Sequence, residues 1–141
     1  MRHKSTNDLN QELMAQPNLD KYITENETHF TDVDISAFLL ELYERCRLSK
    51  AELARQAGMS EVYLHQVFSG RRKPSRDRLL CLCAGLEAGL EDIQRLLKQA
   101  GYAPLYPKLK RDAIIIHGIL SHTPLNEMND KLFSENERTL F

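Results

Sequence analysis

From residue 33 onward, apolar residues recur at intervals of three and four, the spacing that places them on one face of an α-helix. The first such series runs from Val33 to Cys46, and similar series follow it to residue 133. No segment shows the sustained alternation of apolar and polar residues that is typical of a half-buried strand. The pattern therefore predicts an all-α fold.

Residues typical of helix ends separate these apolar series. Ser49 and Glu52 match the capping box S-x-x-E, in which the serine hydroxyl accepts from the Glu52 N–H and the glutamate reaches back to the Ser49 N–H. Ser60 is placed to cap the following helix, and Gly58 before it suits the left-handed backbone position at which many helices end. The six glycines are therefore expected to be helix stops, Gly89 among them.

The series over residues 79–86 is apolar on nearly every side, which predicts a helix at the centre of the fold. Two further helices are expected over roughly 108–121 and 124–133. The apolar residues of 102–141 exceed what two short helices need for themselves. They predict either packing against the flank of the preceding helices or a homodimer interface, and the sequence leaves both open.

Residues 1–33 are polar and carry only a weak amphipathic pattern, which Pro17 interrupts. This composition predicts an acidic N-terminal extension that is partly disordered or forms one or two short helices. The chain is accordingly divided into this extension, a helical domain over 34–101 and a helical C-terminal extension over 102–141.

The net charge of -1 would by itself count against a nucleic-acid partner. The distribution of charge along the chain changes this picture. Residues 1–44 have three basic and nine acidic side chains, a net of -6, whereas residues 45–80 have nine basic and three acidic side chains, a net of +6. Residues 81–141 have seven basic and eight acidic side chains. The basic block 45–80 is therefore a candidate surface for an anionic partner.

Other classes of protein find little support. No apolar run approaches the roughly 18 residues of a membrane span, and no apolar segment follows Arg2 and Lys4 as in a secretory signal. Three cysteines without metal-ligand spacing favour buried thiols in the cytoplasm. The five histidines also lack metal-ligand spacing, and no glycine-rich phosphate loop or nucleophile–base pair is present. We expect no enzyme, no metal and no cofactor.

Two short helices joined by a tight turn are predicted inside the basic block. Ala54 supplies the small residue that two touching helices require, and Gly58 makes the turn four residues later. Leu53, Leu64 and Val67 are placed to fix the angle of the second helix. This is the arrangement of a helix-turn-helix, whose second helix enters the major groove of DNA.

The sequence here resembles the Cro/repressor (Xre-type) family of helix-turn-helix DNA-binding proteins, over about residues 35–100. The stretches that carry the resemblance are residues 48–54 (LSKAELA), 57–60 (AGMS), 63–70 (YLHQVFSG) and 71–75 (RRKPS). The resemblance implies a five-helix repressor-like bundle, to which the N-terminal and C-terminal helical extensions are added. Phe68, where the family often has a charged residue, and Glu61, the first exposed position of the recognition helix, depart from the pattern.

The resemblance also implies which residues contact DNA. The residues expected to read bases are Ser60, Glu61, Val62, Tyr63 and Gln66. Glutamine can form two hydrogen bonds with an adenine edge, and valine can contact a thymine methyl group. The residues expected to hold phosphates are Ser49, Lys50, Ser69, Arg71, Arg72 and Lys73. His65, Arg76 and Arg78 are expected to be surface side chains, and a phosphate contact is the alternative for Arg76 and Arg78.

The sequence thus predicts a cytoplasmic, sequence-specific transcriptional regulator, a repressor in the first instance, that binds double-stranded DNA with helix 60–69. The alternative is a protein-interaction module or antitoxin-like adaptor that uses the same bundle. The acidic N-terminal extension is a candidate surface for a protein partner, or a mask for the basic block when DNA is absent. A homodimer through residues 102–141 fits the paired half-sites that such regulators bind.

Overall fold

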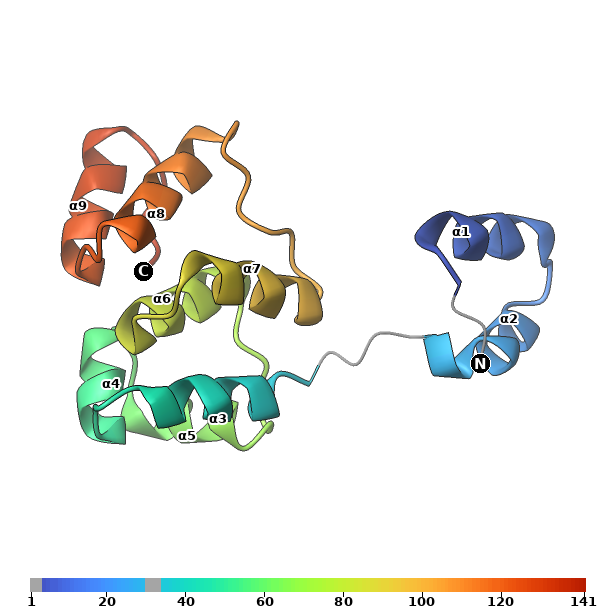
Figure 1. The fold of residues 1–141 in the computed structure, drawn as a ribbon, viewed down its shortest axis with the longest axis horizontal. Coiled ribbons are helices and arrows are strands. Elements are labelled where there is room, and N and C mark those ends of the chain that lie inside the picture. Colours follow the sequence, from blue (N-terminus) through green and yellow to red (C-terminus); the bar gives the residue numbers. More distant parts are fainter. Residues whose placement is uncertain (1–3, 30–33) are drawn as a thin grey trace. The chain divides into compact units, whose positions relative to one another are not determined.

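The computed structural model describes residues 4–29 and 34–141, and the regular elements in these residues are all helices (Figure 1). The all-α prediction is confirmed for this part of the chain. Two compact units are present, Met1–Asp32 and Val33–Phe141. Within the described residues, every helix is too short or too polar to cross a membrane.

The first unit contains α1 (Thr6–Ala15), α2 (Leu19–Glu25) and the short 3-10 helix η1 (Glu27–His29). Ser5 and Asn18 cap the two α-helices by accepting from backbone N–H groups. Polar contacts tie the helices together, since the Lys4 Nζ lies 2.9 Å from the Glu12 carboxylate and 2.6 Å from the Oδ1 of the buried Asn26. The Lys4 ammonium also lowers the pKa of the Glu12 carboxyl.

The second unit contains seven α-helices within residues 34–141. They are α3 (Ser36–Arg45), α4 (Lys50–Gln56), α5 (Glu61–Phe68), α6 (Arg76–Leu86), α7 (Leu90–Gln99), α8 (Lys110–Leu120) and α9 (Leu125–Ser134). Helix α6 is the central one, as its apolar sequence predicts, because it packs against α4, α7 and α9 and buries seven of its eleven residues.

Several predicted helix ends are confirmed. Ser60 accepts from the Tyr63 N–H at 3.1 Å, and Gly58 has the left-handed φ of +67°. Gly89 does not end α6, however. Glu87 takes the left-handed position with φ of +54°, and Gly89 instead begins α7. The N–H of Ala88 then donates to the Cys83 carbonyl at 3.1 Å, which satisfies a carbonyl at the end of α6 and stabilises this ending.

Two of the glycines expected to be helix stops lie inside helices. A Cβ on Gly85 of α6 would be 3.0 Å from a methyl carbon of Leu53 and 3.3 Å from the Cβ of Ala57, so a side chain there would push α4 away. A Cβ on Gly118 of α8 would be 2.6 Å from the terminal methyl carbon of Met128. These glycines allow close helix packing and do not act as stops.

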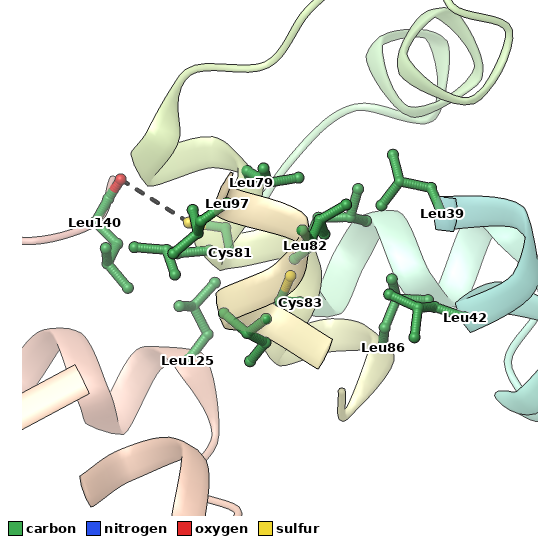
Figure 2. Packing of buried hydrophobic residues seen from close by; sticks show 14 of the residues in the cluster. Leu39, Leu42, Leu79, Cys81, Leu82, Cys83, Leu86, Leu97, Leu125 and Leu140 are labelled. Atoms are coloured by element: carbon green, nitrogen blue, oxygen red, sulfur yellow. Dashed lines mark hydrogen bonds between the residues drawn. The ribbon is translucent and has the colours of Figure 1, made fainter. Parts of the chain in front are cut away.

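The C-terminal helices share the core of the preceding helices (Figure 2). Leu125 of α9 and Leu140 are buried near Cys81 and Leu97. The thiol of Cys81 donates to the Leu140 carbonyl at 3.9 Å, and the Leu140 N–H donates to the Asn129 side chain at 2.7 Å. The sequence left two alternatives open for residues 102–141. The structure shows the first of them, packing against the preceding helices.

Ion pairs and hydrogen bonds join the C-terminal segment to α6 and α7. Arg76 lies 3.2 Å from the buried carboxylate of Asp112, which also accepts from the Tyr106 N–H at 2.9 Å. The expectation that Arg76 is a surface charge is therefore wrong, because 23% of its side chain is exposed and it faces α8. The Gln94 side-chain amide donates to the Leu105 carbonyl at 2.8 Å and accepts from its N–H at 2.7 Å.

The thiols offer a test of this packing. Burial raises the pKa of Cys81 to about 11, with help from the Asp77 carboxylate, and raises the pKa of Cys83 to about 12. Since only the thiolate reacts, about a thousandth or less of either thiol is reactive at pH 8. A disulfide reagent at pH 8 is expected to modify only the half-buried Cys46 quickly, and all three thiols after unfolding in guanidinium. Three fast thiols in the native protein would contradict this packing.

Candidate nucleic-acid interface

Helix α5 presents one face to the core and the other to solvent. Leu64 and Val67 are buried, so the opposite face carries Glu61, Val62 and His65 into solvent. The Val62 side chain is 68% exposed. The helix therefore offers an accessible surface to a partner.

The five predicted base-reading residues lie at different depths around this face. Ser60, Glu61 and Val62 are exposed, whereas Tyr63 and Gln66 are half-buried. Glu61 lies 3.7 Å from the Nε2 of His65, one helical turn away.

Ser49 and Lys50 lie at the N-terminus of α4. The Ser49 hydroxyl accepts from the Glu52 N–H at 3.2 Å, as the capping box predicts. The second half of the box differs, because the Glu52 carboxylate accepts from the Ser49 hydroxyl at 3.1 Å. The Lys50 Nζ lies 4.6 Å above the centre of the Phe68 ring, at the last residue of α5.

The position of Phe68 has a clear physical reason. Its ring meets the Tyr43 ring edge to face, with 5.5 Å between the centres and 72° between the planes. Lys50 lies 5.3 Å from the Tyr43 ring as well. A charged side chain at position 68 would lose both ring contacts, so this departure from the family pattern places a cation beside the end of α5.

The loop after α5 carries the remaining predicted phosphate-binding residues. The Ser69 hydroxyl and the N–H groups of Arg71 and Arg72 all donate to the Gln66 carbonyl, at 3.0 to 3.2 Å. These bonds fix the backbone so that the side chains of Arg71, Arg72 and Lys73 are exposed beside α5. The Ser69 hydroxyl is thus already a donor within the protein.

Lys73 lies over the ring of Tyr102, with 4.8 Å from its Nζ to the ring centre. The Tyr102 hydroxyl donates to the Pro74 carbonyl at 2.6 Å, and burial raises the pKa of this phenol. The segment that follows α7 therefore holds the basic loop in place.

Arg55 and Arg78, which the sequence did not place among the expected DNA contacts, lie near Tyr63 of α5. The guanidinium of Arg78, in the first turn of α6, is 4.9 Å from the centre of the Tyr63 ring, and that of Arg72 is 5.5 Å from it. Arg55, Tyr63 and Arg78 line an open hollow of about 540 Å³ beside the turn at Gly58. The basic composition of 45–80 included both arginines, but spacing along the chain could not show that α6 begins next to α5.

The rest of the described chain offers no group of three histidine, cysteine or acidic side chains placed to hold a metal ion.

Comparison with known proteins identifies the same part of the chain. Residues 34–96 match a family model described as a helix-turn-helix domain. No curated protein and no solved structure matches the chain. The match confirms a helix-turn-helix domain in this part of the chain, and the matched residues include α3 to α6 and the surface around α5.

Proposed function

Because residues 34–96 form a helix-turn-helix domain, we propose that the protein binds double-stranded DNA and acts as a sequence-specific transcriptional regulator, a repressor of the Xre type without catalytic activity. The observation that supports this most is the set of cations around the exposed face of α5. They come from α4 (Lys50), the loop after α5 (Arg71, Arg72, Lys73) and the start of α6 (Arg78).

The proposal divides the surface into two kinds of contact. Gln66 bonds an adenine edge, Val62 contacts a thymine methyl group and Glu61 accepts from a cytosine amino group, while Ser60 and Tyr63 lie beside them. Lys50 and the three cations of the loop contact phosphates, the Ser49 backbone N–H at the start of α4 donates to another, and Ser69 contacts a phosphate when its hydroxyl turns away from the Gln66 carbonyl. The DNA-binding part is then the repressor-like bundle of 34–101, and 102–141 is its C-terminal extension.

We also propose a cytoplasmic homodimer on two half-sites one helical turn apart, with residues 102–141 at the interface. The exposed Leu120 of α8 and Phe133 of α9 support this proposal, because they are 61% and 77% exposed.

Selection of bound duplexes from a random DNA pool tests the function directly. The expected result is a palindromic consensus, together with an affinity that falls steeply with salt. If four to six phosphates are neutralised per subunit, the slope of log K against log salt is about -4 to -5 per subunit. Absence of any binding to duplex DNA at low salt would reject the proposal.

Gln66→Ala is expected to relax specificity at one base pair of the selected consensus. The loss is on the order of 1–3 kcal/mol for the preferred sequence, since a bidentate contact with adenine is removed. Binding to duplexes that carry another base at that position should change little, which competition with single-substitution duplexes measures. An equal loss for every duplex would instead assign Gln66 to the phosphate backbone or to the fold.

A second candidate function is that of a protein-interaction module or antitoxin-like adaptor. The first unit supports it, because its helices carry exposed apolar side chains among acidic ones: Leu13, Met14, Leu19 and Ile23. A stoichiometric complex with a protein partner that forms equally well at low and high salt would favour this function. Loss of that complex on removal of residues 1–30, with DNA binding retained, would assign the two functions to the two units.

A further inference from the structure

Four of the five cations around α5 lie over aromatic rings. Cation–ring contacts number six among the described residues, and five of them involve basic side chains of the segment 45–80. Lys50 lies over the rings of Tyr43 and Phe68, and Lys73 lies over Tyr102. The sixth contact, between Arg95 and Phe38, joins α7 and α3.

Tyr63 makes two of these contacts. Its ring centre lies 5.5 Å from the guanidinium of Arg72 and 4.9 Å from that of Arg78, although these arginines belong to the loop after α5 and to α6. Tyr63 is half-buried and is the third residue of α5, and its backbone N–H donates to the Ser60 cap, so the helix fixes the position of its side chain. One side chain of α5 therefore sets the place of two cations that come from outside the helix.

A ring that already holds an arginine side chain lowers the entropy that the side chain loses when it binds an anion. A free arginine side chain loses much of its rotamer freedom when it contacts phosphate, and a side chain that is already held loses less. A guanidinium above a ring is attracted by the ring face and still has N–H groups at its edge for a phosphate. The contacts of Arg72 and Arg78 with Tyr63 are thus compatible with simultaneous phosphate binding.

We infer that Tyr63 is a positioning residue that holds Arg72 and Arg78 ready for the DNA phosphate backbone. This inference rests on the proposed DNA-binding function and adds Arg78 to the phosphate-binding residues. It also gives Tyr63 a different role from that of a base reader, since its effect on DNA binding passes through two arginines.

A double-mutant cycle on random-sequence duplex at low salt tests this role. Tyr63→Leu is expected to weaken binding about tenfold, the loss that two exposed cation–ring contacts imply, while Tyr63→Phe, which keeps the ring face, changes it less than about twofold. In the Arg72→Gln/Arg78→Gln background, Tyr63→Leu should cost nothing further. Phe38→Leu is the matched control, because it removes an arginine–ring contact between α3 and α7, and it should leave binding unchanged.

The outcomes separate the inference from the function on which it rests. If Tyr63→Leu costs as much without the two arginines as with them, or costs nothing with them, the positioning role is wrong. If the unchanged protein does not bind duplex DNA at all, the proposed function fails instead. Circular dichroism and thermal unfolding check that each variant folds, and Tyr63→Met, which also fills space without a ring face, takes the place of a leucine variant that does not fold.

Discussion

Replacing Arg71, Arg72 and Lys73 together by glutamine is expected to weaken binding to random-sequence duplex on the order of several hundredfold near 0.1 M salt. The three side chains are exposed beside α5, and hydrogen bonds from Ser69, Arg71 and Arg72 to the Gln66 carbonyl fix their backbone. Each phosphate contact contributes about 0.9 to the slope of log K against log salt, so the slope should become less steep by nearly three. Titration of a labelled duplex at several salt concentrations measures both quantities.

A matched variant separates this local effect from a general effect of charge. Arg95→Gln/Lys98→Gln/Lys108→Gln removes the same three positive charges from α7 and the segment after it. It should leave the salt slope unchanged. If both triple variants lower the affinity equally and alter the slope equally, the basic loop would not be the DNA-binding surface, and only the net charge of the protein would matter.

Asp112→Ala is expected to lower the free energy of unfolding by about 3 kcal/mol. The Asp112 carboxylate is buried, and it accepts from both terminal nitrogens of Arg76, at 3.4 and 3.2 Å, and from the Tyr106 N–H at 2.9 Å. Its removal leaves a partly buried guanidinium without its counter-charge and a backbone donor without its acceptor. Urea denaturation, followed by circular dichroism, measures the change.

Asp130→Ala is the control for this prediction, because Asp130 is an exposed carboxylate on α9. Its removal should change stability by less than about 0.5 kcal/mol. A loss below about 1 kcal/mol for Asp112→Ala would mean that desolvation of the ion pair offsets most of what the pair contributes. The C-terminal segment would then be held to α6 mainly by apolar packing around Leu125 and Leu140.

The sequence was sufficient for features that depend on neighbouring residues. The apolar spacing of Leu64 and Val67 predicts the inward face of α5, and both side chains are buried. Ser60 and Gly58 mark the turn between α4 and α5 because a cap and a left-handed position are set within a few residues. The helix-turn-helix could be predicted for the same reason, and the family match over residues 34–96 confirms it.

Features that depend on where one helix lies against another were missed or wrong. Gly85 was expected to be a helix stop, but it lies inside α6 where α4 packs closely against it. Arg76 was expected to be a surface charge, but it forms an ion pair with Asp112 of α8. Phe68 departs from the family pattern, and its contacts with the Tyr43 ring and with Lys50 explain why an aromatic residue stands there. None of these contacts follows from a local pattern, because the partners come from separate helices.

The sequence by itself determined that the described chain is helical and where the second helix of the helix-turn-helix begins and ends, because capping and amphipathic periodicity act over about one turn. Only the tertiary structure decided which cations surround that helix. Arg78 reaches the face of Tyr63 because α6 starts beside α5, and α6 is held there by packing against α4, α7 and α9 and by ion pairs of Arg76 and Asp77 in its first turn. The basic surface therefore depends on how the helices of the bundle pack, and the spacing of residues along the chain does not predict that packing.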